Sequence, residues 1–241
     1  MGCTWKSVIL DQNIKEELTK DFTGFFDRKE YYRSFGVPRK RGLILHGLHG
    51  NGKTISIKAV ARSLNERTKP IPTLYVKSLG LQSTHDDIRS IFEKARETAP
   101  CLLVFEDLNS LVTDDVRSFF LNDIDGLEDN DGILMVGSTN YLDKLDAGIP
   151  KRSSPFDRKY HFPLPAKSER ARYCDFWRTK LWKNASLDFS PDLTSKVTYA
   201  TEGFAFAYLQ EVFVSAMTSI ITGQKASSLV SADMIWSGLS S

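Results

Sequence analysis

The chain has 241 residues, 41% of them apolar, which is enough to bury a hydrophobic core in one medium domain or in a larger domain with a small companion. Its 32 basic and 30 acidic residues give a net charge of +2, so charge alone favours neither a nucleic-acid partner nor an anionic membrane surface. Three widely spaced cysteines, Cys3, Cys101 and Cys174, argue against a disulfide framework and a paired-cysteine metal site, and favour a reducing compartment.

The sequence contains no apolar run near the roughly 18 residues that a membrane span requires. Its first residues, MGCTWKSVILDQ, have neither the apolar core of a signal peptide nor the arginine-rich pattern of a transit peptide. We therefore expect a protein that is not secreted and has no transmembrane segment. The cytoplasm is the default location, and mitochondria stay open as an alternative.

Periodicity predicts helices and strands that alternate along the first two thirds of the chain. Helical spacing over residues 7–35 ends at GVPRKRG and is followed by an apolar strand over 43–45. The alternation continues with helices over 55–68, 85–100 and 114–127 and with strands over 73–79, 101–105 and 133–140. Strands that are apolar on both faces are typical of an α/β protein whose parallel sheet is covered by helices on both sides.

The strand signal fades near Pro165, and the residues after it have helical spacing. We therefore expect an α/β domain over residues 1–165 and a small all-α domain over 166–241. The aromatic residues of this tail recur at helical spacing, which favours a helical core over a platform that stacks nucleic-acid bases. They are Phe176, Trp177, Trp182, Phe204, Phe206 and Tyr208.

GLHGNGKT, residues 47–54, matches the G-x-x-x-x-G-K-[ST] pattern between a predicted strand and a predicted helix. Glycines let backbone amides turn toward a phosphate, and the helix start adds its positive dipole end. Lys53 is expected to reach the outer phosphates, and Thr54 to ligate Mg2+. The residues predicted to bind ATP are Gly47, Leu48, His49, Gly50, Asn51, Gly52, Lys53, Thr54 and Ile55. His46 and His49 are interpreted as strand and loop residues, not as a metal site.

LLVFED, residues 102–107, is an apolar strand that ends in two acids, Glu106 and Asp107. Ligands of parallel sheets bind at the carboxyl ends of the strands, so the acids are expected beside the phosphate loop. A P-loop enzyme needs a carboxylate to hold Mg2+ and another group to orient or deprotonate the attacking water. Successive strand side chains diverge, so Glu106 and Asp107 could divide these tasks.

The chain resembles an AAA-type ATPase along nearly its full length. The matching segments, in the family's order, are RGLILHGLHGNGKT, IRSIFEKARETAPCLLVFEDLNSLV, FLNDIDGLEDNDGILMVGSTN, LDAGIPKRSSPFDRKYHFPLP and TEGFAFAYLQEVFVSA. The resemblance implies a P-loop nucleotide-binding domain, a helical lid, assembly into a hexamer-like ring, and ATP-driven remodelling of a protein partner.

The resemblance also assigns roles to residues. It implies that residues 47–54 are the Walker A loop, that Glu106 and Asp107 stand at the Walker B acids, with Thr54 and Glu106 toward the metal, and that Asn140 is the sensor that positions water. Arg152 matches an arginine that reaches a neighbouring subunit's site, residues 156–158 mark the segment that faces that neighbour, and Gly203 matches a turn of the lid. A solvated surface charge is the alternative for Arg152.

Three features depart from the family's usual pattern. The acids read Glu-Asp, not Asp-Glu, which resembles the mitochondrial AAA chaperone that translocates the Rieske protein and related fungal ATPases, and which predicts slow hydrolysis by the shorter Asp107. Pro155 replaces the second of two arginines. GLQSTH, residues 80–85, stands where threading members carry an aromatic pore loop, so threading of unfolded protein is not expected.

Two functions stay open at this point. The first is a Mg-ATP hydrolase that acts as a homo-oligomeric ring on an unidentified protein substrate, with Lys53, Glu106, Asp107 and Asn140 in one subunit and Arg152 from the next. The second is a nucleotide-gated binding module that hydrolyses little and assembles alone or with an intact paralogue. The module begins almost at Met1, so we expect no additional N-terminal domain.

Overall fold

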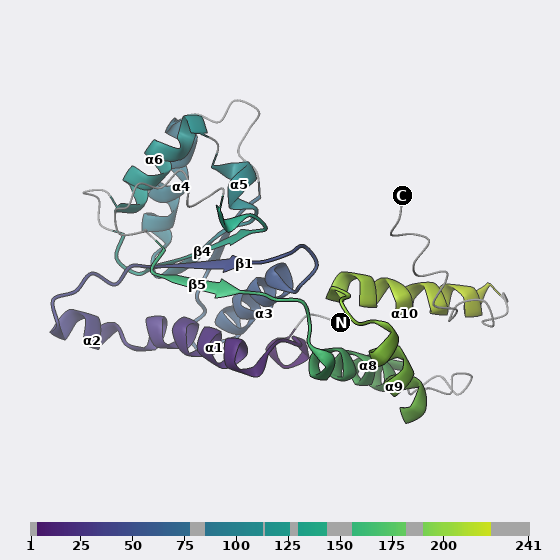
Figure 1. Ribbon diagram of the computed structural model, residues 1–241. Helices are drawn as coiled ribbons and strands as arrows, with labels where there is room; N and C mark the ends of the chain where they lie inside the picture. Colours follow the sequence, from purple (N-terminus) through teal and green to yellow (C-terminus); the bar gives the residue numbers. More distant parts are fainter. Residues whose placement is uncertain are drawn as a thin grey trace. The chain divides into compact units, whose positions relative to one another are not determined.

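The computed structural model describes residues 4–77, 85–112, 114–125, 130–143, 156–181 and 190–222. The chain divides into two compact units (Figure 1). The first comprises Met1–Leu48 and Gly52–Pro163, and the second comprises His49–Asn51 and Leu164–Ser241. Each unit is described by itself, and the domain boundary near Pro165 stays a prediction from the sequence.

A five-stranded parallel sheet forms the centre of the first unit. Its strands are β1 (Arg41–His46), β2 (Thr73–Val76), β3 (Cys101–Phe105), β4 (Ile133–Thr139) and β5 (Arg158–His161), in the order β2-β3-β4-β1-β5. Every pairing is parallel, so the predicted parallel sheet is confirmed. The sequence analysis missed β5, because three of its four residues are polar and only Tyr160 is buried.

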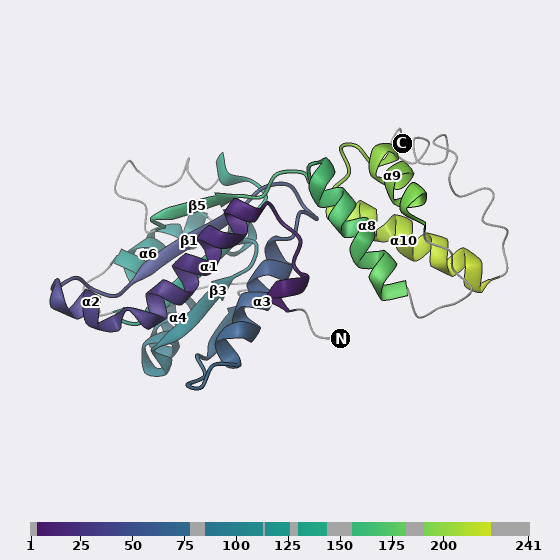
Figure 2. The same cartoon turned by 90° about the horizontal axis from the view of Figure 1, so that it is seen from below.

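Helices cover both faces of this sheet, as the alternation predicted (Figures 1 and 2). On one face α1 (Gln12–Asp27) and α3 (Lys53–Asn65) pack against alternate strand residues such as Leu43, Val104 and Val136. On the other face α4 (His85–Thr98), α6 (Asp114–Asp125) and the short α5 (Leu108–Leu111) pack against the intervening residues, such as Ile44 and Leu103. Both faces of each central strand are therefore buried, which is why these strands read as continuous apolar runs.

Helical segments form the described N-terminal part of the chain. A 3-10 turn, η1 (Trp5–Ser7), precedes α1, and α2 (Lys29–Ser34) follows it. The carboxylate of Asp11 accepts hydrogen bonds from the backbone N–H groups of Asn13 and Ile14, so it caps α1 and fixes where that helix begins.

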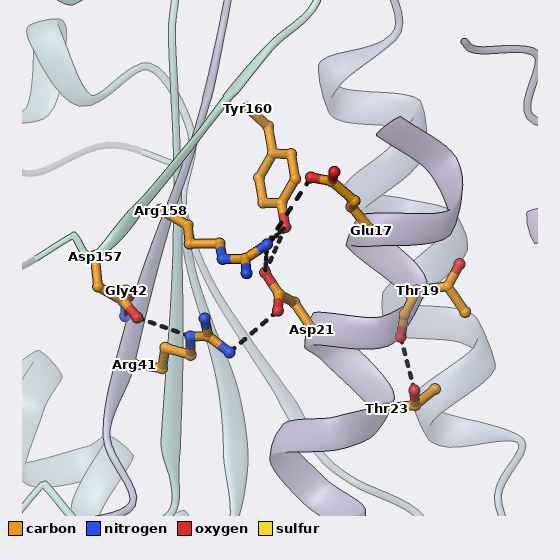
Figure 3. A network of polar contacts seen from close by, with 9 residues as sticks. All are labelled: Glu17, Thr19, Asp21, Thr23, Arg41, Gly42, Asp157, Arg158 and Tyr160. Atoms are coloured by element: carbon orange, nitrogen blue, oxygen red, sulfur yellow. Dashed lines mark hydrogen bonds and ion pairs between the residues drawn. The ribbon is translucent and has the colours of Figure 1, made fainter. Parts of the chain in front are cut away.

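A closed polar cluster joins α1 to the edge of the sheet (Figure 3). Asp21 is 7% exposed and accepts hydrogen bonds from the Tyr160 hydroxyl and from Nη1 of Arg41 at 3.1 Å. Nη1 of Arg158 lies 3.4 Å from the second carboxylate oxygen of Asp21. Asp157 completes the group, because Nε of Arg41 donates to it at 2.8 Å. We call these five residues the Asp21 cluster.

Residues 156–158 were expected to face a neighbouring subunit. In the structure, Phe156 and Asp157 make contacts within their own subunit. Phe156 is buried in the core beneath α4 and α6. The carboxylate of Asp157 accepts from the backbone N–H of Gly42 at 3.1 Å in addition to its bond with Arg41. Arg152 and Pro155 lie outside the described residues.

The described part of the second unit contains the helices α8 (Lys167–Leu181), α9 (Pro191–Ala200) and α10 (Phe206–Ile221). Cys174, Trp177 and Phe213 form its small core, with the rings of Trp177 and Phe213 stacked at 5.3 Å. The helical-core interpretation is therefore right for Trp177, whereas Phe176 and Tyr208 are exposed and Trp182 lies outside the described residues. In the part of the chain that the structure describes, no helix combines the length and apolarity that a membrane span needs.

Candidate functional site

The loop between β1 and α3 has the backbone shape of a phosphate cradle. Gly47, Gly50 and Gly52 all have positive φ angles, of 139°, 80° and 96°. A Cβ atom at Gly47 would lie 2.3 Å from the carbonyl oxygen of Phe162, so no larger residue fits there. Gly52 caps α3 in the left-handed conformation, which directs the first amides of that helix toward the loop.

Lys53 is held inside its own loop. It is the first residue of α3 and is buried, and its Nζ donates to the carbonyl oxygens of Gly47 at 2.6 Å and Leu48 at 2.9 Å. Burial lowers the pKa of Lys53 to about 8, and the negative charge of Asp107 opposes this shift. An ammonium group with little access to water is a strong partner for any anion that replaces the two carbonyls.

The other predicted loop residues differ in exposure. Thr54, Leu48 and Ile55 are exposed, whereas Asn51 is buried. His46 stacks on His161 of β5 with 5.1 Å between ring centroids. Among the residues that the structure describes, no three His, Cys, Asp or Glu side chains are grouped to hold a metal ion.

Glu106 and Asp107 leave the end of β3 in different environments. The backbone N–H of Glu106 donates to the Val76 carbonyl at 3.3 Å, which continues the β2–β3 ladder by one residue. Its Oε1 is shielded from solvent, and no described group stands in hydrogen-bond geometry to it. A carboxylate oxygen in that position needs a hydrogen-bond donor or a cation, because burying it unpartnered costs free energy.

Asp107 adopts a left-handed backbone conformation, with φ 53° and ψ 62°, at the start of α5. Its carboxylate accepts a 2.6 Å hydrogen bond from the Ser110 hydroxyl, and its backbone N–H donates to the Ser138 hydroxyl at 3.2 Å. Left-handed backbone is strained for a residue other than glycine, and such strain is concentrated at functional sites. These two bonds fix the direction of the Asp107 side chain relative to β4.

Asn140 follows the last residue of β4, and the register of the sheet brings it to the same edge. Thr139 pairs with His46, the last residue of β1, while Gly137 pairs with Phe105, the last residue of β3. The phosphate loop, the two acids and Asn140 therefore leave adjacent strands side by side. Of the predicted catalytic residues, Lys53, Glu106, Asp107 and Asn140 are brought together, and Arg152 lies outside the described residues.

Sequence reasoning missed two residues at this edge. Asn109 in α5 donates through Nδ2 to the Thr139 hydroxyl at 2.8 Å and to the Tyr141 carbonyl at 3.0 Å, so it ties α5 to the turn that carries Asn140. Tyr75 in β2 lies beside Glu106, and burial together with this carboxylate raises the pKa of Tyr75. The first relationship depends on where α5 packs against the end of β4, and the second depends on the register of β2 and β3, so neither could be read from the sequence.

A parallel sheet with a glycine-rich loop between β1 and α3 and acids after β3 defines a P-loop nucleotide-binding fold. The model of the family described as "ATPase family associated with various cellular activities (AAA)" matches residues 43–164, and the chain belongs to this family. Its members generally use ATP with Mg2+, so membership indicates ATP binding and hydrolysis.

The chain is also similar to the Cell division cycle protein 48 homolog of Archaeoglobus fulgidus, with 30% identity over 179 residues. That similarity covers 69% of this chain and 24% of the relative. The chain therefore spans about a quarter of the relative's length.

Proposed function

We propose that this chain binds Mg-ATP at the carboxyl edge of its sheet and hydrolyses it slowly, as a subunit of a ring that remodels a protein partner. The observation that carries the proposal is the convergence of Lys53, Glu106 and Asp107 at one edge. Asp107 is close enough to affect the pKa of Lys53, and Glu106 precedes it directly at the end of β3.

The residues at this edge fit a magnesium ion. Mg2+ prefers oxygen ligands, and the site offers the Glu106 carboxylate and the Thr54 hydroxyl. The fit is supported by the chemistry of this donor set, because a carboxylate and a hydroxyl are both oxygen ligands and follow β3 and β1 at the same edge of the sheet. When bound, Mg2+ neutralises charge on the phosphates.

The chain's own residues supply the remaining chemistry. Lys53 exchanges its bonds to two loop carbonyls for bonds to phosphate oxygens. Asp107, fixed by Ser110, orients or deprotonates the attacking water, and Asn140 helps to position that water. Aspartate is one methylene shorter than the usual glutamate, and a misplacement of about 1 Å can cost roughly a hundredfold in rate. Slow turnover is therefore expected.

Assembly is proposed because the site needs a positive charge from outside the subunit. We assign that role to Arg152 of a neighbouring subunit, since an arginine supplied in trans can contribute about 10³ to 10⁵ in rate. Pro155 stands where the family has a second arginine, which lowers the expected rate further. The Glu-Asp order of the acids supports a relationship to the Rieske-translocating AAA chaperone.

The test is steady-state Mg-ATP hydrolysis measured over a range of protein concentrations. We expect the specific activity to rise with concentration as subunits complete each other's sites, and to collapse in Asp107→Asn. Lys53→Ala tests nucleotide binding itself, because it removes the ammonium group that bridges the carbonyls of Gly47 and Leu48. A Lys53→Ala protein with the wild-type rate would contradict the assignment of the loop.

The second candidate is a nucleotide-gated module with little hydrolysis of its own, and Pro155 is the observation that favours it. It predicts tight ATP binding with negligible turnover at every concentration. Pro155→Arg should then raise turnover markedly in a protein that assembles. An unchanged rate in assembled Pro155→Arg protein would count against this candidate.

A further inference from the structure

The register of β2 and β3 places a tyrosine beside the first Walker B acid. Tyr75 is opposite Val104, and Glu106 follows Val104 by two residues, so the three side chains rise from the same face of the sheet. The hydrogen-bond ladder between β2 and β3 extends to Glu106, because the Glu106 N–H donates to the carbonyl of Val76. Tyr75 and Glu106 are therefore diagonal neighbours across two paired strands.

The polar ends of both side chains are shielded from water. The hydroxyl of Tyr75 and Oε1 of Glu106 each expose less than 1 Å², and among the described residues neither has a partner in hydrogen-bond geometry. As diagonal neighbours on one face of two paired strands, the two groups lie within reach of each other. Two buried polar groups with this placement gain most by bonding to each other.

We infer that Tyr75 is a positioning residue for Glu106: its hydroxyl donates to Oε1 and leaves the other carboxylate oxygen to hold the cation. The inference rests on the proposed function, which assigns Glu106 to the metal. Glutamate has one more rotatable bond than the aspartate usual at this position, so its carboxylate needs an additional restraint. Tyr75 supplies that restraint, which reconciles the reversed order of the acids with a defined metal site.

A role of this kind affects metal binding more than nucleotide binding. Partners that orient a metal ligand typically contribute 10- to 100-fold to metal affinity. The phosphate contacts of Lys53 and of the loop amides do not involve Tyr75. Loss of the tyrosine hydroxyl should therefore weaken the enhancement of nucleotide binding by Mg2+ and leave binding without Mg2+ unchanged.

The experiment compares wild type with Tyr75→Phe, which removes one oxygen atom. Equilibrium binding of a fluorescent ATP analogue is measured with saturating Mg2+ and in EDTA, and the ratio of the two affinities is the readout. We expect this ratio to fall by roughly tenfold in Tyr75→Phe. Tyr199→Phe is the matched control, because the Tyr199 side chain is 80% exposed and far along the chain in α9, and its ratio should equal that of wild type.

A double-mutant cycle with Glu106→Gln separates positioning from a structural role. If Tyr75 acts through Glu106, then Tyr75→Phe changes the ratio in the wild-type background and has no further effect in Glu106→Gln. A full tenfold effect in the Glu106→Gln background would overturn the inference. Urea denaturation of all four proteins checks that the folded state is retained, and Tyr75→Leu, whose side chain has no hydrogen-bond donor, must give the same ratio as Tyr75→Phe.

The outcomes distinguish the inference from the function on which it rests. A wild-type protein that binds no ATP analogue would overturn the proposed function and the role of Tyr75 together. A wild type whose affinity rises with Mg2+, with Tyr75→Phe showing the same ratio, would overturn the role of Tyr75 alone and leave the proposed function standing.

Discussion

Asp21 and Glu106 are acidic residues of the same unit, and they differ in how completely their carboxylate oxygens are hydrogen-bonded. Asp21 is surrounded by Arg41, Arg158 and Tyr160, so its carboxylate has a partner on each oxygen (Figure 3). Oε1 of Glu106 is also shielded from water, yet it has no partner in hydrogen-bond geometry among the described residues. A carboxylate with its partners in place stabilises the fold, whereas the Glu106 carboxylate, for which we infer one bond from Tyr75, keeps its other oxygen for a cation.

The comparison implies that the two acids affect stability with opposite signs. Removing charge from the Asp21 cluster leaves arginines without their counter-charge, which is unfavourable. Replacing the Glu106 carboxylate by a neutral group removes the free-energy cost of burying its charge, which is favourable in the absence of ligands.

Asp21→Asn should lower the free energy of unfolding by about 3 kcal/mol, because Arg41 and Arg158 then face a neutral amide. The measurement is urea denaturation. Glu17→Gln is the matched control, since Glu17 is exposed and lies 3.9 Å from Arg158, and it should cost less than about 0.5 kcal/mol. Equal effects of the two substitutions would show that the cluster is not the stabilising element.

Tyr160→Phe should cost about 2 kcal/mol, the value of a hydrogen bond to a charged acceptor. Burial and the hydrogen bond to Asp21 raise the pKa of Tyr160 to about 12 from its ordinary value of 10.0. The stabilisation is therefore complete below pH 10 and is lost as the pH rises through about 12. Denaturation of wild type and variant should differ by a constant amount from pH 7 to pH 9, and a difference that shrinks within this window would contradict the assignment.

Asn109→Ala should slow ATP hydrolysis by about tenfold while changing ATP affinity little. Asn109 binds the Thr139 hydroxyl and the Tyr141 carbonyl on either side of Asn140, so its loss loosens the turn that presents Asn140. The test compares kcat with the equilibrium dissociation constant for ATP. Asn13→Ala, at the opposite end of the unit's sequence in α1, serves as the control and should change neither quantity.

Glu106→Gln should raise the free energy of unfolding by about 1 kcal/mol in EDTA, because a neutral amide loses less than a carboxylate on burial. The same variant should lose most of the Mg2+ enhancement of nucleotide binding. Denaturation in EDTA, and then with Mg2+ and nucleotide, separates the two effects. A variant less stable than wild type in EDTA would place Glu106 with Asp21 among the structural acids.

Features that depend on adjacent residues could be predicted from the sequence. Four of the five strands are apolar runs, and the phosphate loop and the acids were placed correctly in chain order at one edge of a parallel sheet. The fifth strand, Arg158–His161, reads as polar because it is an edge strand in which only Tyr160 is buried.

Relationships between distant segments could not be predicted. The bonds of the Asp21 cluster join residues 116 and 139 positions apart, and no period or motif in the sequence encodes them. The proximity of Tyr75 to Glu106 depends on which residues of β2 and β3 stand opposite each other, and a shift by one residue would place the tyrosine on the other face.

Nζ of Lys53 donates to the carbonyls of Gly47 and Leu48, so an anion that binds Lys53 must displace these two peptide groups. A lone sulfate or phosphate ion must displace both carbonyls while contacting only part of the loop, so its net gain is small. A triphosphate engages several loop amides at once and offsets the loss more fully. Discrimination between short and long phosphate chains thus begins at a single ammonium group, before any contact with the base.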